Sequence, residues 1–295
     1  MQASNFSFSV RGFLAALAVA ATVAAVPAQA EIVSATIEEV DAENRTLRLR
    51  VDDGDSEARM VSARVGPGDV LIAREGAQVR GELVTLGGRL HLQNIWPDDS
   101  RAIGTMRNLA RQLRRDTLQR GRRAFRGIGE PWPRFALFDQ QGELFLSEGT
   151  RGDYVIVNFI FTRCTVPNMC PAATRRMAET QKLARERGIE NFRLVSITLD
   201  PDYDTPGILA AYGDSRGIDS ANFHFLTGPE QVIADLTEQM GILSRDHPEE
   251  IIQHTMSTTL VDPVGRIFYR VPGSNWSAEA FIRQIERHRE NERES

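Results

Sequence analysis

Both cysteines of this chain fall within seven residues, and this placement constrains its fold and chemistry more than any other feature. The chain has 295 residues, and its two cysteines lie in the segment Cys164-Thr-Val-Pro-Asn-Met-Cys170. The apolar run Tyr154-Val-Ile-Val-Asn-Phe-Ile-Phe161 comes just before them and predicts a strand buried on both faces. The loop can therefore form a local disulfide, cycle between dithiol and disulfide, or offer two thiolates to a metal ion.

The overall composition is that of an ordinary globular protein. Hydrophobic residues make up 41% of the chain and charged residues 25%. The length predicts about two domains. A formal net charge of -5 does not favour nucleic acid as a partner, because a nucleic-acid-binding protein needs an excess of positive charge.

The first thirty residues resemble a secretory leader. Arg11 precedes a mostly apolar run, Gly12 to Val26, and Pro27-Ala-Gln-Ala30 offers a small-residue cleavage site. The apolar run is shorter than the roughly 20 residues that span a bilayer. We therefore predict a cleaved signal peptide over 1–30 and an exported protein in an oxidising compartment such as a bacterial periplasm. The alternative is an uncleaved membrane anchor.

Residues 31–97 predict a small β-domain. Hydrophobic and polar residues alternate in Arg45-Thr-Leu-Arg-Leu-Arg-Val51, and Asp52-Asp-Gly54 predicts a turn. Further short strands are separated by glycine-containing breaks such as Gly66-Pro-Gly68. Closely spaced short strands favour a small barrel, which we interpret as OB-like. Three residues of this segment could bind a metal but are interpreted as ordinary barrel residues: Met60, His91 and Trp96.

Residues 98–129 predict a basic, amphipathic helix that links two domains. Nine arginines face a single acid, Asp116, between residues 100 and 126. The segment can be a solvated linker packed on a neighbouring domain, or a docking site for a membrane surface or an acidic partner. The arginines are Arg101, Arg107, Arg111, Arg114, Arg115, Arg120, Arg122, Arg123 and Arg126. The apolar residues at helical intervals are Ile103, Met106, Leu109, Leu113, Leu118 and Phe125.

Residues 130–295 alternate between strand and helix patterns and predict a thioredoxin-like α/β domain. A hairpin, a βαβ unit and a closing ββα unit together give a sheet covered by helices. The predicted strands are 135–138, 144–146, 153–161, 193–199, 222–225, 258–261 and 266–269. The predicted helices follow the cysteine loop, cover 206–213 and 229–241, and begin again at Ser277.

The cysteine loop is expected to meet the start of a helix. Cys170 comes immediately before Pro171, which suits a first helical turn. The partial positive charge of a helix N-terminus stabilises a thiolate, so we expect it to lower the pKa of Cys170. Thiolate is the form that both metal binding and disulfide exchange require.

His254 is the best-placed third ligand among the five histidines. It leads into the strand expected to lie beside the cysteine loop. Two thiolates and one imidazole form a soft, low-coordinate set that suits Cu(I), and Cu(II) with an added ligand. Zinc would require a fourth protein ligand, and none is evident. A plain disulfide with an ordinary loop histidine stays open as the alternative.

Three segments together resemble the SCO/SenC family of copper-binding, thioredoxin-like proteins. They are Val155-Ile-Val-Asn-Phe-Ile-Phe-Thr-Arg-Cys164 with Cys170-Pro171, then Ser196-Ile-Thr-Leu-Asp-Pro-Asp-Tyr-Asp-Thr-Pro206, and His254 ahead of Asp262-Pro-Val-Gly265. The resemblance covers roughly residues 130–290. It implies a copper ion bound by Cys164, Cys170 and His254. It also implies copper delivery to a cytochrome oxidase copper site, or reduction of the thiols of that site.

The resemblance also bears on two aspartates and on the loop length. It places Asp200 and Asp204 near the metal loop, whereas a local interpretation has Asp204 or Thr205 capping the helix that Pro206 opens. The family usually spaces its cysteines by three residues, and this chain has five between Cys164 and Cys170. The barrel and the arginine-rich helix are also additions to the usual family plan.

Four functional hypotheses follow from these patterns. The first is an exported copper chaperone whose partner is an oxidase copper-site subunit or another copper chaperone. The second is a thiol-disulfide oxidoreductase that uses Cys164 and Cys170 as its redox pair but does not need His254. The third is a peroxidase that uses one of these cysteines, and the fourth is an adaptor in which the cysteines only form a staple.

Overall fold

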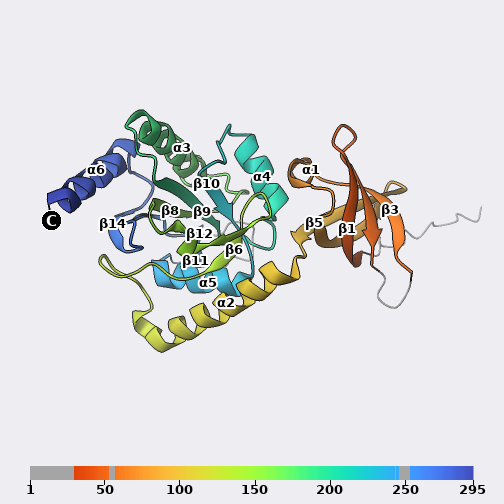
Figure 1. The fold of residues 1–295 in the computed structure, drawn as a ribbon, viewed down its shortest axis with the longest axis horizontal. Helices are drawn as coiled ribbons and strands as arrows, with labels where there is room; N and C mark the ends of the chain where they lie inside the picture. Colours follow the sequence, from red (N-terminus) through yellow and green to blue (C-terminus); the bar gives the residue numbers. More distant parts are fainter. Residues whose placement is uncertain (1–29, 53–56, 243, 246–252, 295) are drawn as a thin grey trace, which may run out of the picture.

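Two folded bodies joined by a long helix make up the chain (Figure 1). The computed structural model describes residues 30–52, 57–242, 244–245 and 253–294. The expected leader therefore lies almost wholly outside the described residues, as does most of the turn at Asp52-Asp-Gly54. Within the described ranges, no helix is both long and apolar enough to cross a membrane.

The N-terminal body is a closed five-stranded barrel. Its strand order is β1-β2-β3-β5-β4, and antiparallel pairing of β1 with β4 closes it. Alternate residues of β2 point inward, so that Leu47, Leu49 and Val51 are buried, as the alternation predicted. The elements are β1 (Glu31–Asp41), β2 (Thr46–Val51), β3 (Arg59–Arg64), α1 (Pro67–Ile72), β4 (Gln78–Leu86) and β5 (Arg89–Pro97).

Helix α2 (Ser100–Arg120) runs from the barrel along the C-terminal body (Figure 1). Asp99 caps its start, since Oδ1 accepts a hydrogen bond of 2.8 Å from the Ala102 backbone N–H. The helix ends at Gly121, whose φ of 52° disfavours other residues. The buried stripe consists of Met106, Leu109, Leu113 and Thr117.

Two residues that we expected on the apolar face of this helix are instead exposed. Leu118 is 63% exposed and Phe125 is 51% exposed. The α-helix stops at Arg120 and a short 3-10 turn, η1 (Gly121–Arg123), follows, so Phe125 lies beyond the helical repeat. Leu118 sits one residue after the buried Thr117, which turns it about 100° away from the buried stripe.

The C-terminal body is a five-stranded sheet in the order β10-β9-β8-β13-β14. Helices α3 and α6 cover one face, and α2 and α5 cover the other (Figure 1). The bounds are β6 (Ala136–Phe138), β7 (Leu144–Leu146), η2 (Ser147–Thr150), β8 (Tyr154–Ile160), α3 (Cys170–Glu186), β9 (Phe192–Thr198), α4 (Pro206–Asp214), β10 (Phe223–Leu226), α5 (Glu230–Met240), β11 (Ser244–Arg245), β12 (Gln253–His254), β13 (Ser257–Val261), β14 (Ile267–Pro272) and α6 (Ala278–Glu294).

The strands and helices predicted for residues 130–295 are all present within a few residues of their expected bounds. Their arrangement is the predicted thioredoxin-like sandwich of sheet and helices. The central strand β8 is buried at every position, which explains why its sequence is almost continuously apolar.

Helix α1 of the barrel was not predicted. The glycines on either side of Pro67 indicated a break, but Pro67 opens a six-residue helix. The side chain of Asp69 then accepts a hydrogen bond of 3.2 Å from the Gly66 backbone N–H. A short helix therefore occupies the position of an expected turn.

The two bodies meet where α1 packs on the first turn of α4. The contact depends on two glycines, because a Cβ on Gly68 would lie 1.7 Å from the Gly207 carbonyl oxygen. A Cβ on Gly207 would lie 2.1 Å from Asp69 Oδ1. That oxygen is buried without a hydrogen-bond partner among the described residues. The barrel is thus held against α4 by backbone-to-backbone packing that leaves no room for side chains.

Gly68→Ala should destabilise the chain by about 1–3 kcal/mol, because the new methyl group overpacks the contact with Gly207. Urea unfolding followed by circular dichroism measures this. The matched control is Gly104→Ala on α2, where a Cβ would meet no atom within 4 Å. That variant should gain up to about 1 kcal/mol from helix propensity. Equal stability of the two variants would show that the glycine contact is not required.

Asp69→Asn should increase the free energy of unfolding at neutral pH. Burial raises the pKa of Asp69 to about 6 from an ordinary value of 3.8. Between these values the folded chain keeps a proton that the unfolded chain has lost, so stability falls as pH rises through this window. The amide carries no charge, and the variant should gain about 3 kcal/mol near neutral pH, with the gain vanishing below about pH 4.

The matched control for this measurement is Asp202→Asn, because Asp202 is exposed. Its urea midpoint should equal that of the unmodified chain both near neutral pH and below about pH 4. A pH-independent difference between Asp69→Asn and the unmodified chain would contradict the assignment to carboxylate burial.

Candidate metal and thiol site

The two cysteines lie together at the end of the central strand. β8 ends at Ile160, Cys164 lies in the loop that follows, and Cys170 is the first residue of α3. Both are free thiols, and their side chains are in hydrogen-bonding contact. Cys170 is fully buried, whereas Cys164 is partly exposed. One thiol is therefore accessible from solvent, and the other is reached only through it or through the protein interior.

The five intervening residues form a surface loop. Thr165, Val166, Pro167 and Asn168 are exposed and carry no charge. Few backbone hydrogen bonds hold the loop: the Cys164 N–H donates to Phe161 O at 3.3 Å, and the Met169 N–H donates to Val166 O at 3.1 Å. The wider spacing still allows the thiols to meet.

The expected lowering of the Cys170 pKa is wrong. Burial raises the pKa of the Cys170 thiol to about 12 from an ordinary value of 9.0, and the neighbouring Cys164 adds to this increase. Desolvation of the thiolate therefore outweighs the favourable field of the helix N-terminus. Cys170 stays protonated at neutral pH unless a positively charged ligand replaces its proton.

Asp204 holds the start of the cysteine loop. Its carboxylate is fully buried and accepts hydrogen bonds from the Thr162 backbone N–H at 3.1 Å, from the Thr162 hydroxyl, and from the Thr198 hydroxyl at 2.5 Å. Burial raises the pKa of Asp204, while these three donors oppose the increase. Asp204 does not cap α4. Thr205 does so, with its hydroxyl accepting from the Ile208 N–H at 3.4 Å.

Asp200 holds the next residue of the same loop. The Arg163 guanidinium donates to Asp200 Oδ2 from Nε at 2.9 Å and from Nη2 at 2.7 Å. The same guanidinium lies 4.3 Å from the centre of the Tyr203 ring. The two aspartates thus fix the two residues that come immediately before Cys164. Their hydrogen-bond partners are Thr162 and Arg163, so both aspartates act on the loop residues that come before the first thiol.

Only the backbone of His254 is described, and its side chain lies outside the described part of the structure. His254 pairs with Ser244 in the short β11–β12 ribbon. The next strand, β13, runs antiparallel to β8, with Leu260 opposite Ile156. The start of β13 therefore lies at the end of β8 from which the cysteine loop leaves. Among described side chains, no three His, Cys, Asp or Glu residues gather as a metal site.

Thr174 and Tyr212 are polar neighbours of the thiols that the sequence did not indicate. Their hydroxyls are 3.0 Å apart and buried. Burial is the main cause that raises the pKa of Tyr212, and both cysteines contribute to the increase. Thr174 lies one helical turn after Cys170, so its spacing could have revealed it. Tyr212 comes from α4, and only the fold brings it there.

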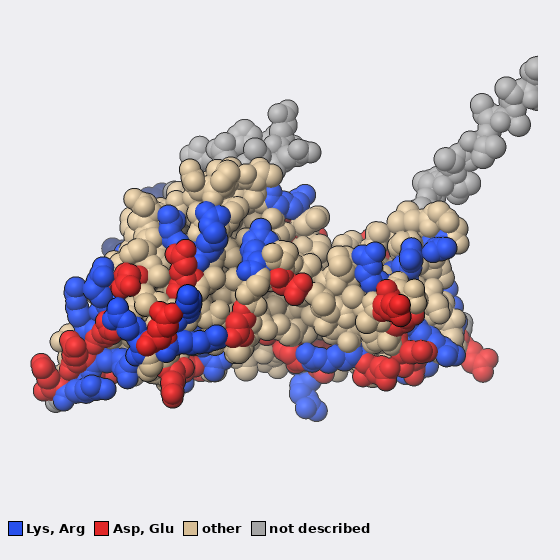
Figure 2. Space-filling model, turned by 90° about the horizontal axis from the view of Figure 1, so that it is seen from above, with Lys and Arg blue, Asp and Glu red and all other residues tan. Residues whose placement is uncertain are grey.

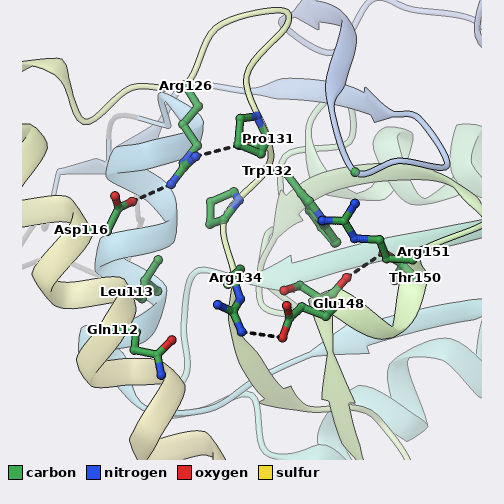
Figure 3. Close-up of a pocket in the computed structure, with 13 residues that line it drawn as sticks. Gln112, Leu113, Asp116, Arg126, Pro131, Trp132, Arg134, Glu148, Thr150 and Arg151 are labelled. Atoms are coloured by element: carbon green, nitrogen blue, oxygen red, sulfur yellow. Dashed lines mark hydrogen bonds and ion pairs between the residues drawn. The ribbon is translucent and has the colours of Figure 1, made fainter.

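A well-formed hollow lies elsewhere in the molecule. It measures about 300 Å³ and is lined by Trp132, Leu113 of α2 and several charged side chains (Figure 3). Ion pairs satisfy its charges, since Arg126 pairs with Asp116 at 2.5 Å and a second pair joins Arg134 to Glu148 at 2.8 Å. None of the residues predicted to form the functional site lines this hollow.

Comparisons with known proteins agree with this fold. A family model described as SCO1/SenC matches residues 129–290. The SCO2-like protein of Rickettsia conorii is 32% identical over 142 residues, which cover 45% of this chain and 64% of that protein. The match thus spans less than two thirds of that relative. A solved SCO1/SenC family lipoprotein from Bacillus anthracis is 28% identical with a TM-score of 0.50, covering 55% of this chain and 98% of that one.

A solved structure of Bradyrhizobium japonicum ScoI with copper bound is also similar. It is 23% identical with a TM-score of 0.45, covering 55% of this chain and 99% of that one. The bound copper is a property of the Bradyrhizobium japonicum protein.

The sheet topology and the loop of paired thiols define a thioredoxin-like protein whose cysteines follow the central strand. More than half of the chain matches the family model. The chain belongs to the SCO1/SenC family.

Asp204→Ala should loosen the cysteine loop and lower stability by about 1–3 kcal/mol, because it leaves the buried donors of Thr162 and Thr198 without an acceptor. Alkylation of the reduced protein by iodoacetamide should then proceed faster at both thiols. Asp202→Ala removes an exposed carboxylate from the same segment and serves as the control. Equal alkylation rates in the two variants would refute a role for Asp204 in holding the loop.

Proposed function

We propose that this chain is an exported copper chaperone that binds copper through Cys164, Cys170 and His254. One observation carries the proposal: two free thiols are in contact at the end of the central strand, one partly exposed and one buried. Membership of the SCO1/SenC family supports the choice. The client is a cytochrome oxidase copper-site subunit or another copper chaperone.

The donor set favours copper over harder metals. Thiolates are soft ligands that select Cu(I), and an imidazole from His254 completes a three-coordinate set. The path of the backbone supports His254 as a ligand. The strand that follows it, β13, begins at the end of the sheet where the cysteine loop leaves β8. Binding replaces the proton of the Cys170 thiol, and the metal charge compensates the buried thiolate.

The exposure of the loop supports a transfer role. Cys164 is accessible, and the four residues that follow it form an uncharged surface. A client thiolate can therefore approach the metal from the side of Cys164 and displace the protein ligands one at a time. Cys170 would release the metal last because it is the buried ligand.

Thiol-disulfide exchange is the second candidate, and the contact between two free thiols favours it. In this reaction Cys164 attacks a client disulfide, Cys170 resolves the mixed disulfide, and the client leaves with two reduced thiols. The protein gains one disulfide and gives up two electrons and two protons. The high pKa of Cys170 assigns the initial attack to the accessible Cys164.

The N-terminal body is proposed to be an OB-like barrel. Its strand order β1-β2-β3-β5-β4, with α1 between β3 and β4, supports this interpretation. We also propose that the barrel and α2 are additions to the family domain, since the family model begins at residue 129. The leader predicted from the sequence of residues 1–30 supports export across a membrane.

His254→Ala should weaken copper binding by more than the 10–100-fold typical of a lost outer ligand partner, because the imidazole would be a direct ligand. Competition titration of the reduced protein against a Cu(I) chelator measures this. His91→Ala, on barrel strand β5, is the matched control and should bind like the unmodified chain.

Copper affinity that is the same in the His254→Ala and His91→Ala variants would refute the ligand assignment. Retained reduction of a client disulfide by the same His254→Ala variant would then favour the thiol-disulfide role. Loss of copper binding in Cys164→Ser and Cys170→Ser is expected under the chaperone proposal.

A further inference from the structure

The outer side of α2 carries a continuous stripe of arginines. Arg107, Arg111, Arg115 and Arg122 follow one another at intervals of four, four and seven residues and are exposed. At 100° per residue, Arg107, Arg111 and Arg115 lie within a narrow sector of α2 on the side opposite the buried Met106, Leu109, Leu113 and Thr117. From Arg107 to Arg115 the stripe is about 12 Å long, at 1.5 Å per residue, and Arg122 follows in the 3-10 turn η1.

No carboxylate of the described residues lies within ion-pair distance of this stripe. The single acid of the segment, Asp116, pairs with Arg120 and Arg126 on the inner side. Arg114 pairs with the buried Asp235 of α5, also on the inner side. Among described residues, Arg107, Arg115 and Arg122 have no ion-pair partner, and Arg111 bonds only to the neutral Asn108.

The stripe differs from the opposite face of the molecule. On the face seen in Figure 2, which looks down on the side opposite α2, basic and acidic side chains are intermixed. On the outer side of α2 no other element covers the helix (Figure 1). The net charge of the chain is -5, so this local excess of positive charge opposes the overall balance.

Large apolar side chains accompany the arginines. Leu118 lies within the stripe and is 63% exposed. Ile128 lies beyond the helix and is 67% exposed, whereas Phe125 is partly covered by the Arg270 guanidinium, which lies 4.6 Å from the centre of its ring. A lipid surface takes up both groups, because guanidinium groups pair with phosphates while apolar side chains enter the region of the headgroups.

We propose that the stripe of Arg107, Arg111, Arg115, Leu118 and Arg122 docks the protein on an anionic lipid surface. The helix lies flat on the membrane and keeps its inner side packed on the C-terminal body. Binding is electrostatic and reversible, and it weakens as salt is added. This surface acts independently of the copper ligands, so it goes beyond the proposed chaperone function.

The test is co-sedimentation of the protein with vesicles of phosphatidylcholine and phosphatidylglycerol, beside pure phosphatidylcholine vesicles. The protein used in the test lacks the predicted leader, and every described helix and strand lies between Glu31 and Glu294. The helix variant carries Arg107→Gln, Arg111→Gln and Arg115→Gln. The matched control carries Arg64→Gln, Arg89→Gln and Arg287→Gln, which remove the same charge from exposed positions elsewhere.

The unmodified chain should bind the anionic vesicles at low salt and not the neutral ones. Each arginine near an anionic surface contributes about fivefold in affinity, so the helix variant should lose on the order of a hundredfold. The control variant should bind like the unmodified chain. Circular dichroism and copper titration should be the same in all three proteins, which separates this surface from the metal site.

Equal loss in the helix variant and the control would overturn the proposal, because binding would then follow net charge alone. Absence of vesicle binding by the unmodified chain would also overturn it. Binding of the helix stripe to poly-glutamate without binding to vesicles would assign the surface to an acidic protein partner and refute the lipid interpretation.

Discussion

The buried carboxylate of Asp204 is the constraint on which the geometry of the site depends. It brings together the loop after β8 and the end of β9 through Thr162 and Thr198. The backbone donor and hydroxyl groups that it accepts from would otherwise be buried without partners. Because Thr162 lies two residues before Cys164, this one side chain sets where the cysteine loop leaves the sheet. Asp200 reinforces the same loop through Arg163.

The same segment also connects the site to the barrel. α4 begins at Pro206, two residues after Asp204, and its first turn packs against α1 of the barrel at Gly207. A displacement of the barrel would therefore act on the segment that holds the cysteine loop. The connection is short and consists of backbone contacts and buried hydrogen bonds, which transmit small shifts more directly than a flexible linker would.

Much of the fold follows from local patterns. The continuous apolar run before Cys164 predicted the central strand, and alternation in residues 45–51 predicted a barrel strand, because burial of one or both faces of a sheet dictates these periods. Pro171 and Ser277 correctly indicated helix starts. The two cysteines predicted the position of the site, because residues that are so close in sequence also lie close in space.

The remaining features depend on contacts between distant segments. Thr162 and Asp204 are 42 residues apart, and nothing local distinguishes that aspartate from a helix cap. The pKa of Cys170 was predicted in the wrong direction because the helix field is visible in sequence, whereas the depth of burial is not. Helix α1 was not predicted, because a glycine next to a proline indicates a turn as readily as the start of a helix.

The paired glycines at positions 68 and 207 have a consequence for how such a two-part protein is assembled in evolution. A barrel joined to a family domain by a helix alone could be exchanged freely between relatives. Here the family domain must carry a glycine at position 207, and the barrel must carry a glycine at position 68. Transplanting this barrel onto a domain with any larger residue at that point would prevent the close approach of α1 to α4.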